Sequence, residues 1–111
     1  MNKQEIKQFM ALIQQFRTVD PEMQAQTILT ILNVALHEEH PDGYSIKDLS
    51  EQLGLTQASA SRNVMAWSKL TRAKVNGPDF IQALECHVNR SRKRLSMTLK
   101  GRLFLESIFP V

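Results

Sequence analysis

The stretch that decides the fold runs from Ser45 to Leu70 and reads SIKDLSEQLGLTQASASRNVMAWSKL. Ser45 and Asp48 have the spacing of a capping box, in which two side chains satisfy the first backbone N–H groups of a helix. Gly54 favours the left-handed conformation of a helix end, and Thr56 can cap a new helix. Apolar residues recur at helical spacing at Ile46, Leu49 and Leu53. The stretch therefore predicts two short helices joined by a tight turn.

The second of these helices has two contrasting sides. The side predicted to be buried carries Ala60, Val64, Trp67 and Thr71. The opposite side carries Ala58, Arg62, Met65 and Lys69, flanked by Gln57, Ser59, Ser61 and Asn63. Small side chains would let the helix backbone approach a DNA major groove, where Gln, Asn and Arg can form paired hydrogen bonds with base edges. The alternative is an ordinary helical hairpin with a solvated outer face.

Composition and charge narrow the class of protein. The 111 residues suffice for one domain, and 42% hydrophobic with 23% charged residues is ordinary for a soluble globular chain. No apolar run reaches membrane-spanning length, and the single cysteine fits a reducing cytoplasm. Residues 1–55 hold four basic and eight acidic residues, a net −4, whereas residues 56–111 hold ten basic and three acidic residues, a net +7. A cationic half favours a polyanionic partner.

Two longer helices are predicted before the central pair. The first spans residues 2–16 and carries one apolar stripe of Ile6, Phe9, Met10, Ile13 and Phe16. The second spans about residues 21–39, with Asp20 as its cap and Pro21 at its first position. His37, His40 and Asp42 could hold a metal, but histidines also interact well with a helix C-terminus and the spacing of helical metal sites is absent. We expect no metal and no other cofactor.

A β-hairpin is predicted over residues 80–98, which we call the wing. The apolar register of its first strand is assigned to Phe80, Leu84, Cys86 and Val88, and that of its second strand to Leu95 and Met97. Its tip is cationic, with Arg90, Arg92, Lys93 and Arg94. Thr98 can cap a last helix. The predicted fold is mainly α with a small β-hairpin (α+β), a single winged helix–turn–helix domain over residues 1–111 in the order α-α-α-α-β-β-α.

These segments resemble a known family. LSEQLGLTQASASRNV (49–64) and NRSRKRLSMTLKGR (89–102) are similar to the MarR (multiple antibiotic resistance regulator) family of winged-helix transcription factors, and the similarity covers roughly residues 20–105. The chain departs from the family pattern at Asn89, where the family usually has Asp, and at Ser91, where a second arginine is common. It also lacks the long C-terminal helices through which family members dimerise. Some relatives bind small aromatic effectors between helices, although no residue pattern here supports an effector.

The resemblance and the residue patterns together imply a cytoplasmic homodimer that binds duplex DNA and regulates transcription, most simply as a repressor. The residues expected to face the major groove are Thr56, Gln57, Ser59, Ser61, Arg62 and Asn63, with Arg62 and Asn63 as the leading base readers. Lys69, Arg90, Arg92, Lys93 and Arg94 are expected to contact the DNA backbone or the minor groove. Segments 1–17 and 99–111 are expected to form the dimer interface through Ile6, Phe9, Met10, Ile13, Phe16, Leu103, Phe104 and Ile108.

Two other functions fit the sequence. A winged helix can serve as a protein-interaction module, which would suit the acidic N-terminal half. It can also serve as a DNA-binding accessory factor in replication or recombination. We do not expect an enzyme, because the sequence has no nucleophile paired with a base, no cluster of acid–base groups and no phosphate loop.

The cationic tip of the wing generates the first prediction. Changing Arg90 and Arg92 together to alanine should weaken binding to all duplexes alike, because phosphate contacts carry no sequence information. The slope of log affinity against log salt should flatten by up to about two phosphate contacts. Titration of an arbitrary duplex at several salt concentrations measures this slope, and an unchanged slope would remove both arginines from the interface.

Overall fold

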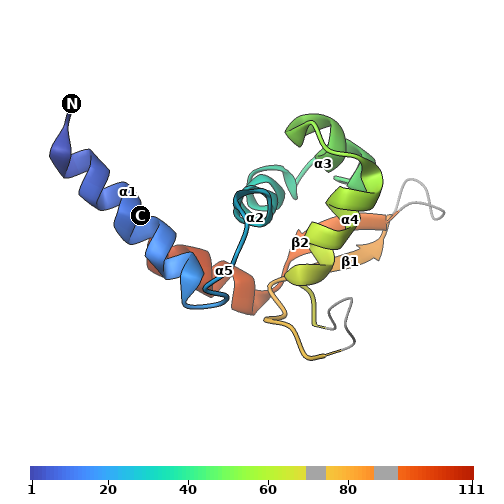
Figure 1. The fold of residues 1–111 in the computed structure, drawn as a ribbon. Coiled ribbons are helices and arrows are strands. Elements are labelled where there is room, and N and C mark those ends of the chain that lie inside the picture. Colours follow the sequence, from blue (N-terminus) through green and yellow to red (C-terminus); the bar gives the residue numbers. More distant parts are fainter. Residues whose placement is uncertain (70–74, 87–92) are drawn as a thin grey trace.

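The computed structural model describes residues 1–69, 75–86 and 93–111. Its elements, in chain order, are α1 (Lys3–Arg17), α2 (Ala25–His37), α3 (Ile46–Leu53), α4 (Gln57–Ala66), β1 (Ile81–Glu85), β2 (Lys93–Met97) and α5 (Leu99–Ile108), as Figure 1 shows. The two strands form an antiparallel sheet. The predicted element order and the mixed α+β class are therefore confirmed.

Local capping places the ends of the short helices where the sequence predicted them. The Ser45 hydroxyl accepts from the Asp48 N–H, and the Asp48 carboxylate accepts from the Ser45 N–H at 2.9 Å, which completes the capping box of α3. Gly54 ends α3 with φ of 66°, in the left-handed region. Thr56 caps α4 by accepting from the Ser59 N–H at 3.0 Å, and Thr98 caps α5 by accepting from the Gly101 N–H.

The predicted start of the second helix is wrong. The Asp20 carboxylate accepts from the Glu22 N–H at 2.9 Å, and the Asp20 carbonyl accepts from the Met23 N–H at 3.1 Å. Asp20 and Pro21 therefore make a turn, a role that suits these residue types as well as a helix start does. α2 begins four residues later than predicted, at Ala25, and ends at His37 rather than Glu39.

An aromatic cluster around Trp67 holds the helices together. The Trp67 indole is fully buried, with Phe16 edge-on at 6.4 Å and Phe80 stacked at 5.8 Å between ring centroids. Phe104 lies 5.7 Å from Phe16 and 4.8 Å from Phe80. The cluster joins α1, α4, α5 and the segment before β1. Phe16 is 2% exposed and Phe104 is half-buried, so both rings, which the sequence analysis assigned to a dimer interface, pack in or against the domain's own core.

The strand register agrees with the prediction in β2 and, in β1, gains one buried residue that was not predicted. Leu95 and Met97 are 0% and 3% exposed, as expected. In the first strand, Phe80 and Leu84 are half-buried and Cys86 is buried, as predicted, and Val88 lies outside the described residues. Ile81, on the other register, pairs with Met97 and is 1% exposed. Phe80 precedes the strand, and its N–H donates to the Trp67 carbonyl at 2.7 Å. The Ile81 N–H also lies 3.1 Å from the Trp67 carbonyl oxygen, so the start of β1 is held to the end of α4.

Backbone contacts attach the sheet to the helices at two places. The Leu95 N–H donates to the Tyr44 carbonyl at 2.7 Å, which ties β2 to the segment before α3. Tyr44 itself is buried, and its burial raises the pKa of its phenol. The nearby negative charge of Asp48 raises this pKa further, by a smaller amount. At α5, a Cβ added to Gly101 would lie 2.2 Å from the Phe80 carbonyl oxygen. Only glycine permits this approach of α5 to the chain before β1.

Glu38, just after α2, links three elements through one carboxylate. Its side chain is 7% exposed and accepts from the Arg102 guanidinium at 2.6 Å and from the Met97 N–H at 2.7 Å. A buried carboxylate needs such partners, because desolvation of the charge is otherwise costly. The end of α2 is thereby fixed to both β2 and α5.

Candidate nucleic-acid interface

The predicted two-sided character of α4 is present in the structure. Ala60, Val64 and Trp67 are buried, as predicted, and Thr71 lies outside the described residues. The exposed residues on and next to α4 are Thr56, Gln57, Ala58, Arg62, Ala66 and Lys69. Ser59, Ser61 and Met65 are half-buried. The outer face of α4 is thus open to solvent and consists mainly of small residues.

Asn63 does not lie on this outer face. It is 8% exposed, and its Oδ1 accepts from the Thr27 hydroxyl at 2.8 Å. Its Nδ2 donates to the Ser59 carbonyl at 2.9 Å. Both ends of the amide are therefore occupied within the protein. The prediction that Asn63 is a leading base reader is wrong, because this residue attaches α4 to α2.

The polar side chains that remain on the outer face are few. Gln57 stands at the first position of α4 and Arg62 in its middle, and both are exposed. Neither side chain makes a hydrogen bond or ion pair with another residue in the part of the chain that the structure describes. Thr56 is exposed, but its hydroxyl caps α4. Lys69 lies beyond the end of α4, where its carbonyl accepts from the Gly77 N–H at 2.8 Å.

The wing is described only in part. Arg90 and Arg92 lie outside the described residues. Lys93 is exposed at the start of β2, opposite Glu85. Arg94 is half-buried beside Gly43 and Cys86, and its Nε is buried without a hydrogen-bond partner among the described residues. The aliphatic part of Arg94 therefore packs against the domain, while Lys93 is exposed.

The residues considered for a metal make local contacts instead. His37 Nδ1 lies 2.9 Å from the Asn33 carbonyl oxygen, and its ring stacks on Tyr44 with 4.9 Å between centroids. His40 Nδ1 accepts from the Asp42 N–H. Within residues 1–69, 75–86 and 93–111, no three His, Cys, Asp or Glu side chains gather as metal ligands would. Over the same residues, no helix is long and apolar enough to cross a membrane.

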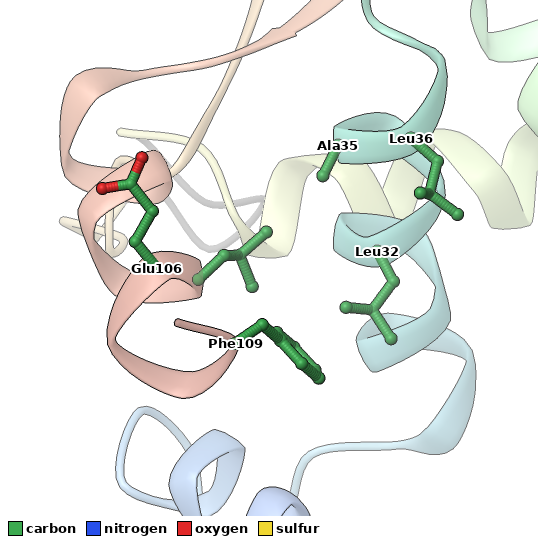
Figure 2. A pocket seen from close by; sticks show the side chains of 6 residues that line it. Leu32, Ala35, Leu36, Glu106 and Phe109 are labelled. Carbon is green, nitrogen blue, oxygen red and sulfur yellow. The ribbon is translucent and has the colours of Figure 1, made fainter. Parts of the chain in front are cut away.

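A second surface lies away from α4. We call it the apolar trough, the hollow between α1, α2 and the C-terminal end of α5. Its two adjoining parts, of about 440 and 360 Å³, share Leu32 and Phe109. Leu32, Ala35 and Leu36 of α2 line this hollow together with Phe109, which follows α5, and Figure 2 shows Leu32 on the side of α2 nearest to Phe109. On the α1 side the lining includes Phe9 and Ile13. This surface is almost entirely apolar.

The exposed residues of α1 and the trough differ in part from the residues predicted for a dimer interface. Ile6, Phe9 and Met10 are 43%, 63% and 58% exposed, and Ile13 is half-buried. Ile108 is partly buried against the core. Leu103 is 57% exposed but does not line the trough. The structure adds three exposed residues that the sequence pattern did not single out: Leu29, Leu36 and Phe109. An apolar stripe alone does not separate core positions from exposed positions.

No protein-family model, curated protein or solved structure matches this chain. The function therefore has to be inferred from the geometry of the chain's own residues.

Asn63 generates the second prediction. Asn63→Ala should lower the free energy of unfolding by about 1–3 kcal/mol, because it leaves the buried Thr27 hydroxyl without its acceptor. Denaturant unfolding of the free protein measures this change. The matched control, Ser61→Ala on the outer side of the same helix, should change stability by less than about 0.5 kcal/mol. Unchanged stability of Asn63→Ala together with lost DNA affinity would return Asn63 to the role of a base reader.

Proposed function

We propose that this protein is a winged-helix transcriptional regulator that binds duplex DNA sequence-specifically, most simply as a repressor that occupies an operator. α4 would enter the major groove, and the wing would hold the flanking backbone. The observation that carries the proposal is the outer face of α4. It is exposed, lined by small side chains, and carries Arg62 and Gln57, whose side chains have no partner among the described residues, while its inner face is fixed to the core through Trp67 and Asn63.

The charge distribution supports the same partner. The net charge of +7 in residues 56–111 falls on the half of the chain that holds α4 and the wing. The acidic half holds α1, α2 and α3, of which α2 and α3 pack against α4. DNA affinity depends on neutralising phosphates, so cations are expected on one side of the domain. This separation of charge also orients the domain as it approaches DNA.

We also propose that the protein acts as a homodimer, with a second copy covering the apolar trough. Six exposed side chains lie on α1 and along the trough: Ile6, Phe9, Met10, Leu29, Leu36 and Phe109. Their exposed fractions run from 43% to 80%. Together they amount to roughly 700 Å² at about 200 Å² for a fully exposed large side chain. A stable interface buries about 800 Å² per partner, so the available area is of the right size.

The shape of α1 favours a second copy over another partner. Figure 1 shows α1 extending away from the other elements, and residues 1–11 are all exposed. The same chain thus offers a projecting apolar ridge, formed by α1, and a trough that is also apolar. A two-fold axis would place each ridge against the other copy's trough, since both copies then use the same patch. It would also present two α4 helices to one duplex, about 34 Å or a multiple of it apart.

The third prediction tests DNA binding itself. In a native gel, the protein should shift a random-sequence duplex at low salt, and raising the salt should weaken the shift steeply because counterions compete for phosphates. Absence of any shift at low salt would favour the protein-interaction function. Nuclease protection of one site beside a promoter would support a regulator, whereas even coverage of a long duplex would point to an accessory factor.

The fourth prediction tests the dimer. Phe9→Asp should convert a dimer into a monomer in sedimentation at micromolar concentration, because it places a charge in the proposed interface. Operator affinity should fall although no DNA-facing residue has changed. Leu103→Asp is the matched control, since Leu103 is similarly exposed but lies outside the trough. A monomeric unmodified protein would contradict the proposal, and a monomer produced only by Leu103→Asp would move the interface to the other side of α5.

A further inference from the structure

The outer face of α4 contains few groups that could identify a base pair. Within Gln57–Ala66, Arg62 is the only cation, and there is no Asp or Glu that could accept a hydrogen bond from cytosine. Asn63, whose amide would suit adenine, is held on the buried side by Thr27 and Ser59. Within Gln57–Ala66, the exposed side chains that can form paired hydrogen bonds with a base are therefore Gln57 and Arg62.

Arg62 has the better position of the two. The residues one turn before and after it on the same side are Ala58 and Ala66, and both are exposed. The one long side chain beside Arg62 along the helix is the half-buried Met65, so the α4 backbone can come close to a groove on the Ala58 and Ala66 side. Gln57 lies at the very start of the helix, and Lys69 lies beyond its end.

We infer that Arg62 recognises one guanine in each half-site and that this contact is the main source of sequence specificity, an inference that rests on the proposed function. The guanidinium is a planar fork whose two N–H groups match the O6 and N7 acceptors of guanine. No described residue competes for those N–H groups. Lys69, with a single rotatable ammonium group, contacts the backbone and adds affinity without selectivity.

The experiment starts with selection from a random duplex pool of about 20 base pairs, long enough for two half-sites one turn apart. The selected sequences should share a guanine in each half-site. Replacing that guanine–cytosine pair by adenine–thymine should weaken binding of the unmodified protein by about 5- to 150-fold, the value of one good bidentate pair. Placing 7-deazaguanine there, which lacks only the N7 acceptor, should also weaken binding.

Arg62 variants connect these losses to one side chain. Arg62→Ala should bind the guanine, adenine and 7-deazaguanine duplexes equally. The variant has already lost the contact with guanine, so changing the base removes nothing further. Arg62→Gln should prefer adenine at the same position. Lys69→Ala is the control and should weaken binding to all three duplexes by a similar factor. Circular dichroism melting verifies that each variant is folded.

The outcomes separate this inference from the proposed function. Selected sites without a common guanine, or an Arg62→Ala variant that keeps the discrimination against 7-deazaguanine, would overturn the inference while leaving DNA binding intact. Failure of the unmodified protein to bind any duplex at low salt would overturn the proposed function as well. Loss of discrimination in Arg62→Ala, with Lys69→Ala still discriminating, would establish Arg62 as the guanine reader.

Discussion

Two hydrogen bonds between Thr27 and α4 set the orientation of the surface on which the proposed function depends. The Trp67 indole N–H donates to the Thr27 carbonyl at 2.7 Å, and the Thr27 hydroxyl donates to Asn63 at 2.8 Å. Asn63 and Trp67 are four residues apart, one turn of helix, so the two bonds fix α4 against rotation about its own axis. Each contributes only about 0.5–1.5 kcal/mol, but both donors are buried and would be costly to leave without an acceptor.

The sequence allowed the local structure around α3 and α4 to be predicted because capping is a short-range property. Ser45, Asp48, Gly54 and Thr56 act on backbone groups within four residues of themselves, and all four occupy their predicted roles. The same reasoning failed at Asp20, where a turn and a helix start satisfy the backbone equally well. Packing farther along the chain decided between them.

The candidate site was predictable only in part, since burial depends on contacts between distant segments. Arg62 and Gln57 are exposed as expected, but Asn63 lies near the boundary between the two sides of α4, and Thr27 in α2 draws it inward. The burial of the α1 residues likewise could not be predicted from the sequence alone. The stripe of α1 is continuous in the sequence, yet Phe16 is in the core and Phe9 is exposed, because the rest of the domain covers only the last turns of the helix.

The contacts of the Glu38 carboxylate restrict which substitutions are tolerated at Glu38 and Arg102. Loss of Arg102 alone would leave a buried negative charge with the Met97 N–H as its remaining partner, and loss of Glu38 alone would leave that N–H without an acceptor. Neither position tolerates replacement in isolation as readily as an ordinary surface ion pair does. In sequences that share this fold, Glu38 and Arg102 should therefore be kept together or replaced together. Where both are replaced, the residue in place of Glu38 should be a neutral side chain that accepts a hydrogen bond from the β2 backbone.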